Sequence, residues 1–135
     1  MAFQFSDASV NAALDAIETA IGTGAILKIR SGAAPATVAT AASGTVLATL
    51  TLPSDWLAAA ASRSKAKLGT WEDASADAAG TAAHFEITAS NGTTRHIQGT
   101  VTATGGGGDM TLDNVSIASG QTVTITAFTL NGPAA

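Results

Sequence analysis

The spacing of apolar residues changes its period at Gly24, and this change constrains the fold more than any other feature of the chain. From Ser6 to Gly22, apolar side chains recur at steps of three and four residues, as in an α-helix that packs along one face. From Ala25 onward they alternate with polar residues, which is typical of half-buried β-strands. The pattern therefore predicts a mainly β domain with one N-terminal amphipathic helix.

The N-terminal helix has recognisable ends. Ser6 supplies a capping hydroxyl, Asp7 places a negative charge in the first turn, and Gly22 suits the left-handed position after the last turn. We expect the helix to bury one apolar stripe and to expose its polar side. The stripe contains Val10, Ala13, Leu14, Ile17 and Ile21, and the exposed side contains Asn11, Asp15, Glu18 and Thr19.

Two strands are expected next, at 25–30 and 45–52, and Pro53 ends the second. Their inward side chains would be Ala25, Leu27, Ile29, Val46, Ala48, Leu50 and Leu52. Residues 58–61 are four alanines, which favour a short helix. Residues 65–68 are compatible with a short strand with exposed lysines, and 71–80 resemble an acidic surface loop.

The second half of the chain is expected to contain strands only. A hairpin is predicted over 84–101, with a three-residue loop preferred because it buries apolar residues together; this register pairs Phe85 with Ile97 and Glu86 with His96. The four glycines at 105–108 would form a flexible connection to strands at 110–112, 115–117 and 123–130, the last with a bulge at Ala127-Phe128.

One helix followed by about seven short strands predicts an antiparallel β-sandwich of jelly-roll or Ig-like type. At 135 residues the chain fits a single domain, which we place at 6–135, with residues 1–5 as an N-terminal arm.

Charge and composition exclude several classes of partner. Six Lys and Arg against ten Asp and Glu leave no basic surface for nucleic acid. No apolar run approaches the ~20 residues of a membrane span, and the N-terminus lacks the basic and apolar regions of a signal peptide. The absence of Cys excludes disulfides and thiolate chemistry.

The sequence also lacks a catalytic constellation. His84 and His96 are the only imidazoles, and we expect both to be ordinary strand-surface side chains. Asp73, Ser75 and Asp77 have the spacing that opens a calcium loop, but Ala78 replaces its turn glycine, and His84 stands where a bidentate Glu belongs. We therefore expect no enzyme activity, no metal and no cofactor.

Four aromatic residues are candidates for an interface: Phe3, Phe5, Trp56 and Trp71. The tryptophans could anchor a partner or could fill the core of the domain. Phe3 and Phe5 precede the helix cap on a segment that would normally fray, which predicts an arm that docks on its own domain or on a neighbour. Phe5 could alternatively pack on Val10 as a hydrophobic staple.

The surface must be largely uncharged, because 31 Ala, 20 Thr and 14 Gly fill nearly half of the chain. Such a surface is poor for electrostatic steering and suits broad, permanent contacts. The composition is that of a subunit in an assembly.

Three segments carry a family resemblance: FSDASVNAALDAIETAIGTGAILKIRSG, GTVLATLTLP and MTLDNVSIASGQTVTITAFTL. In these segments, which cover about half of the chain, the protein resembles small virion proteins of tailed bacteriophages. The resemblance implies a non-enzymatic decoration (cement) protein, made in the host cytoplasm and bound to the outer capsid surface. Its partner would be the major capsid protein, and it would form a homotrimer.

Two other functions remain open. A tail or baseplate structural protein would have the same composition. A small carbohydrate-binding β-sandwich module would need exposed aromatic rings, for which Trp56 and Trp71 are the candidates.

Overall fold

The computed structural model describes residues 3–132, which are mainly β with one N-terminal helix. The helix is α1 (Asp7–Ile21). Eleven short strands follow within the described range: β1 (Ile26–Arg30), β2 (Val46–Thr51), β3 (Ser64–Ala66), β4 (Trp71–Asp73), β5 (Gly80–Thr81), β6 (His84–Thr88), β7 (Arg95–Ala103), β8 (Met110–Leu112), β9 (Ser116–Ile117), β10 (Val123–Ile125) and β11 (Thr129–Asn131). The predicted fold class is confirmed at this level.

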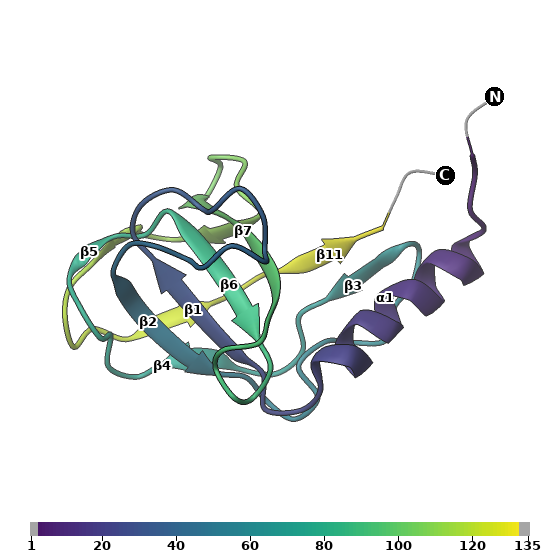
Figure 1. The fold of residues 1–135 in the computed structure, drawn as a ribbon, viewed down its shortest axis with the longest axis horizontal. Helices are drawn as coiled ribbons and strands as arrows, with labels where there is room; N and C mark the ends of the chain where they lie inside the picture. Colours follow the sequence, from purple (N-terminus) through teal and green to yellow (C-terminus); the bar gives the residue numbers. More distant parts are fainter. Residues whose placement is uncertain (1–2, 133–135) are drawn as a thin grey trace.

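One curled five-stranded sheet forms the body of the molecule, in the order β2-β1-β6-β7-β8 (Figure 1). Its first four strands pair antiparallel, whereas β7 and β8 are parallel. Three two-stranded ribbons complete the fold: β10 with β4, β11 with β3, and β5 with β9. The ribbon of β3 and β11 lies beside α1, and together they extend from one end of the sheet (Figure 1).

The helix begins and ends where the sequence predicts. The Ser6 hydroxyl accepts a hydrogen bond from the Ser9 amide at 3.1 Å. At the other end, Gly22 has a φ of 87°, and its amide donates to the Glu18 carbonyl at 2.9 Å. A left-handed backbone costs little at glycine, and it turns the chain sharply toward β1.

The core is shared by the sheet and the ribbon of β4 and β10, because Trp71, Val123 and Ile125 of that ribbon belong to it. It contains the inward side chains of β1, as their alternation predicts, and an aromatic chain that crosses the domain. In β2 the alternation breaks at the bulge opposite Ile29 and Arg30: Val46, expected to face inward, is only partly buried, and Leu47 is buried in its place. Trp56 lies 5.9 Å from Trp71 between ring centroids, Trp71 lies 5.5 Å from Phe128, and Phe128 lies 5.7 Å from Phe85. These rings fill space that the many alanines leave open.

The middle of the chain differs from the sequence expectation. The alanines at 58–61 are extended, because the Ala58 amide donates to the Ala66 carbonyl and the Ala61 amide to the Ser64 carbonyl. The lysine at the centre of β3, Lys65, is buried rather than exposed. Residues 71–73 form strand β4 rather than an acidic loop, because the buried Trp71 anchors them to the core.

The hairpin of β6 and β7 has a longer loop than expected. The Ala89 amide donates to the Thr94 carbonyl, and a bulge follows between Ile87 and Thr88. The register is therefore shifted from the preferred one: Phe85 lies opposite Gly99 and Glu86 lies opposite Gln98. An added Cβ at Gly99 would come within 2.7 Å of the Phe85 ring, so the ring packs directly on the Gly99 backbone.

The four glycines at 105–108 also have a different role. They form a tight return loop that places β8 parallel to β7, with the Gly108 amide donating to the Thr102 hydroxyl at 3.0 Å. An added Cβ at Gly106 or Gly108 would come within 2.9 Å of the Thr102 side chain. The expected strand over 123–130 divides at Ala127-Phe128, so β10 pairs with β4 and β11 pairs with β3.

Candidate functional site

The two tryptophans do not provide an interface. Trp56 and Trp71 are both 0% exposed, and their indole nitrogens donate to the backbone carbonyls of Gly22 and Leu68. The structure thus corrects the interface alternative and places both rings in the core. It also leaves neither ring free as a stacking surface for a sugar.

The two phenylalanines of the arm are accessible. Phe3 is 95% exposed and Phe5 is 53% exposed. The arm is attached to the rest of the domain by Arg63, whose Nη1 donates to the Phe5 carbonyl at 2.7 Å and pairs with Asp7 at 3.1 Å. Phe5 and Val10 line the same apolar groove, the arrangement expected of a hydrophobic staple.

Helix α1 faces the domain with much of its polar side, contrary to expectation. Asn11 Oδ1 accepts from the Arg63 amide at 3.0 Å, Asp15 Oδ1 from the Ala60 amide at 3.0 Å, and Glu18 Oε1 from the Leu57 amide at 3.1 Å. These three side chains satisfy backbone amides of the segment 57–63, which is extended over 57–61 and turns at 62–63. A buried backbone amide without a hydrogen-bond acceptor lowers the stability of the fold. Because α1 supplies these acceptors, its polar side faces this segment.

Lys65 is the charged centre of this contact. Its Nζ, on a side chain that is only 3% exposed, lies 2.7 Å from Asp15 Oδ1, 2.9 Å from Glu18 Oε2 and 2.9 Å from the Ala58 carbonyl. Burial alone would lower the pKa of Lys65, but hydrogen bonds to Asp15 and Glu18 outweigh it and raise that pKa above 10.5. The Lys65 hydrogen bond, followed by that from the Ala60 amide, lowers the pKa of Asp15 below 3.8.

These shifts predict a pH window for the contact. The lowered pKa of Asp15 contributes stability above pH 3.8 that is lost as the pH falls through the folded value, and the raised pKa of Lys65 contributes stability below pH 10.5 that is lost as the pH rises. We expect Asp15→Asn to lower the free energy of unfolding across the neutral range and to have little effect well below pH 3.8. Urea unfolding of both proteins across this range measures the difference. A difference that does not change with pH would contradict the assignment.

The opposite side of α1 is exposed and uncharged. The apolar stripe expected to be buried is divided: Val10, Leu14 and Ile21 are buried, whereas Ala13 is exposed and Ile17 is 38% exposed. Two outward rows with a spacing of four residues contain Ala8, Ala12, Ala16 and Ala20 in one, and Ser9, Ala13 and Ile17 in the other. A groove of about 390 Å³ lies at the N-terminal end, lined by Phe5, Ser9, Val10 and Ala13. We call this surface, with Phe3, the arm–helix surface.

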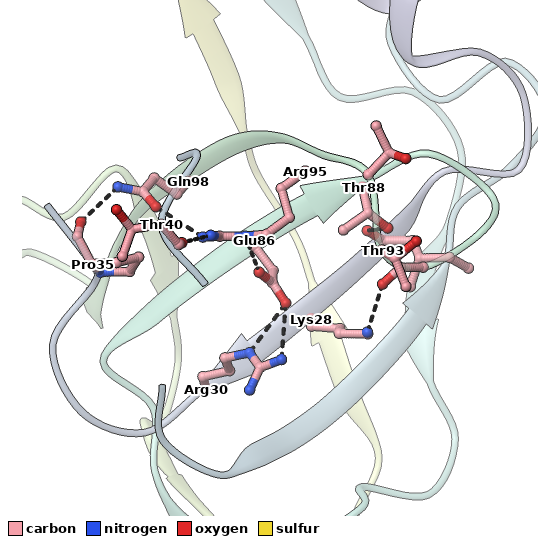
Figure 2. A network of polar contacts seen from close by, with 12 residues as sticks. Lys28, Arg30, Pro35, Thr40, Glu86, Thr88, Thr93, Arg95 and Gln98 are labelled. Atoms are coloured by element: carbon pink, nitrogen blue, oxygen red, sulfur yellow. Dashed lines mark hydrogen bonds and ion pairs between the residues drawn. The ribbon is translucent and has the colours of Figure 1, made fainter. Parts of the chain in front are cut away.

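A second polar cluster lies on the outer face of the sheet (Figure 2). Glu86 on β6 is 2% exposed and lies between two arginines, with Oε1 3.1 Å from Arg30 Nη2 and Oε2 2.5 Å from Arg95 Nε. The sequence predicted an outer-face position for Glu86 but not its burial. The loop 31–45 crosses the sheet here (Figure 1), and Glu86 beneath it is shielded from solvent.

Side chains of the sheet hold this loop through its carbonyl groups. Arg30 donates to Gly44 at 3.2 Å, Arg95 donates to Thr40, and Gln98 donates to Pro35 at 2.9 Å. His84 was expected to be a strand-surface side chain, but it is buried, and its Nδ1 lies 2.7 Å from the Gly32 carbonyl oxygen. The cluster binds the chain's own backbone, and we assign it a structural role.

The acidic residues of the expected calcium spacing are engaged in hydrogen bonds. Asp73 accepts from the Thr49 and Ser75 amides, and Asp77 accepts from the Thr49 hydroxyl at 2.7 Å. Within residues 3–132, no group of three or more acidic, His or Cys side chains is arranged to hold a metal ion. Among the same residues, no helix has the length and hydropathy to cross a membrane.

Comparisons with protein-family models, with curated proteins and with solved structures find no match to this chain.

Proposed function

We propose that this chain is a non-enzymatic structural protein of a tailed-bacteriophage virion, which decorates the outer capsid surface and stabilises it. The proposal is carried by the arm–helix surface, where Phe3, Phe5 and Ile17 are exposed beside a helix face without charge. Exposed aromatic residues beside an apolar groove are typical of a surface that a partner covers. The resemblance of both ends of the chain to small virion proteins is the reason for proposing a bacteriophage capsid as the assembly to which it binds.

The mechanism is cross-linking of the capsid lattice. Each copy would contact more than one subunit of the major capsid protein, and three copies would form a trimer at a local threefold position. Burial of two Phe side chains contributes roughly 1.5–3 kcal/mol each, before the entropy of ordering the arm is subtracted. This free energy is modest for one copy, but in a trimer it acts three times at one site.

The finer fold description belongs to the same proposal. We propose that the ribbons and the sheet form an antiparallel β-sandwich of jelly-roll or Ig-like type. The ribbon of β4 and β10 supports this, because Trp71, Val123 and Ile125 share one core with the inward side chains of the sheet. A rigid sandwich would hold α1 and the arm at a fixed angle to the capsid.

The arm provides the test. We expect deletion of residues 2–5 to leave the domain folded, because Phe3 and Phe5 are outside its core, and to reduce attachment to capsids. Full-length and truncated proteins are mixed with undecorated heads, and bound protein is measured after sedimentation. Circular dichroism of the free proteins is the control for folding.

The outcomes separate the function from the role of the arm. Saturable binding of the full-length protein to heads, in fixed ratio to the major capsid protein, supports decoration. Equal occupancy of both proteins would remove the arm from the mechanism. Absence of binding by the full-length protein would overturn the proposed function.

A further inference from the structure

One tight turn of the chain consists of residues that ordinarily avoid its backbone conformation. Ala61 and Ser64 exchange two backbone hydrogen bonds, of 2.9 and 3.0 Å, across the turn that precedes β3. The two residues between them are both left-handed, with a φ of 51° at Ser62 and 66° at Arg63. Two positive φ angles in succession are typical of a type I′ turn, which favours Asn-Gly because a Cβ atom is strained in this conformation.

The rest of the described chain meets this requirement with glycine. Nine glycines have a positive φ within residues 3–132, and Ser62 and Arg63 are the only residues of another type there that do. The turn therefore keeps side chains at two positions where glycine would remove the strain. Strain of this kind persists where the surrounding contacts fix the backbone, and it often marks residues with a functional role.

Contacts with α1 and with the residue after β11 fix the backbone of Arg63. Its amide donates to Asn11 Oδ1 at 3.0 Å, and its carbonyl accepts a hydrogen bond from the Gly132 amide at 2.8 Å. Gly132 packs directly on the helix, because an added Cβ there would overlap Val10 Cγ1. Since α1 begins and β11 ends beside this turn (Figure 1), three segments set the direction in which the Arg63 side chain leaves the backbone.

The guanidinium group of Arg63 joins the arm to the start of α1. Its Nη1 lies 2.7 Å from the Phe5 carbonyl oxygen and 3.1 Å from Asp7 Oδ1, and the Arg63 side chain is only 14% exposed. Residues 3–5 have no helix or strand of their own to order them. Terminal segments fray unless a contact ties them down, and Arg63 supplies such a contact. Glycine at position 63 would relieve the turn but would leave the arm without this contact.

From these observations we infer that Arg63 is a positioning residue for the arm. It holds the arm, with Phe3 and Phe5, in a defined direction before a partner binds, and the strained turn places its guanidinium group where it can do so. The benefit for attachment rests on the proposed function, in which the arm binds the capsid. A segment that becomes ordered only on binding loses part of the binding free energy to that ordering, whereas a segment ordered in advance does not.

The order of the arm can be measured on the purified protein without capsids. The backbone order parameter of the Phe5 amide, obtained from NMR relaxation, should be about 0.85 in the wild type and below about 0.6 in Arg63→Gly and Arg63→Gln. Arg63→Gln keeps a side chain in the left-handed position, so it separates the loss of the guanidinium group from the relief of the turn. Ser62→Gly is the matched control, because it relieves the same turn and keeps the guanidinium group; its arm should stay ordered.

The strain itself has a separate readout. Ser62→Gly should raise the ratio of folded to unfolded protein by about two- to fivefold, because the strain that it removes exceeds the flexibility that glycine adds to the unfolded chain. Urea unfolding of the variant and the wild type measures this ratio. A lower ratio would show that the turn is not strained and would overturn this part of the inference.

Attachment to capsids is measured with the same variants. Both Arg63 variants should bind undecorated heads at least about fivefold more weakly than the wild type, the factor that corresponds to ordering one further residue on binding. Ser62→Gly should bind as the wild type does. Sedimentation of mixtures at several protein concentrations gives the affinities, and circular dichroism of each variant is the control for folding.

Each result has a defined meaning. An arm that loosens in both Arg63 variants, together with weaker attachment, supports the inference. An arm that is equally ordered in the wild type and in either Arg63 variant would overturn it, as would an arm that Ser62→Gly also loosens. Looser arms with unchanged attachment would overturn the benefit of ordering the arm in advance and leave the proposed function standing. If the wild type does not bind heads, the proposed function fails, and the relaxation measurement still decides whether Arg63 orders the arm.

Discussion

Replacement of Glu86 by alanine is expected to lower the free energy of unfolding by about 3–5 kcal/mol. Glu86 is 2% exposed and pairs with Arg30 and Arg95, whose side chains are themselves only 16% and 12% exposed. Without the carboxylate, two guanidinium groups face each other beneath the loop 31–45 and lack a counter-charge. Because domains of this size are stable by about 5–15 kcal/mol, the variant should lie near the limit of folding. Urea unfolding followed by circular dichroism measures the loss.

Two further variants distinguish the effect of the Glu86 charge on stability from the effect of replacing any glutamate. Glu72 on β4 is exposed and accepts a hydrogen bond from Thr124, so Glu72→Ala should change stability by only about 0.5 kcal/mol. Glu86→Gln keeps the shape and removes the charge, and its effect should lie between the other two. Equal losses for Glu86→Ala and Glu72→Ala would show that the arginines do not depend on Glu86.

The parts of the fold that were predicted correctly depend on local chemistry. The ends of α1 follow from Ser6 and Gly22, whose capping geometry involves only neighbouring residues. The strict alternation of apolar and polar residues in β1 correctly predicts which of its side chains face the core, and Leu27 and Ile29 are indeed 0% exposed. The irregularity at Ala127-Phe128 was predicted as a bulge within one strand, whereas the structure has two separate strands, β10 and β11, on either side of it.

The parts that were missed depend on contacts between distant segments. The alanines at 58–61 favour a helix locally, but hydrogen bonds to β3 and to α1 make them extended. The burial of Lys65 follows from Asp15 and Glu18, which lie roughly fifty residues away in sequence. Propensity and alternation contain no information about such partners.

The candidate site was half predicted. Phe3 and Phe5 are exposed beside the helix, and their position before the cap identified them as an arm. The predicted orientation of α1 was wrong. A pattern of apolar residues cannot show that the backbone amides of residues 57, 60 and 63 need hydrogen-bond acceptors from the helix. The row of alanines at 8, 12, 16 and 20 was a signal in the sequence that the apolar stripe concealed.

Leu14→Asp and Ile17→Asp test this orientation directly. Leu14 is 5% exposed and Ile17 is 38% exposed, although both belong to the same apolar stripe of α1. We expect Leu14→Asp to lower the free energy of unfolding by several kcal/mol, because a carboxylate without a partner enters an apolar core. Ile17→Asp should lower it by about 1 kcal/mol or less.

The pair is matched because both variants place Asp in the interior of one helix. The cost of aspartate in a helix, about 0.7 kcal/mol relative to alanine, is therefore similar in both and cancels in the comparison. Urea unfolding at low protein concentration, where association between chains is weakest, isolates the stability of the single chain. Equal losses in the two variants would mean that the helix buries its whole apolar stripe. A larger loss for Leu14→Asp is the result expected if Leu14 packs in the core and Ile17 stays at the edge of the exposed helix face.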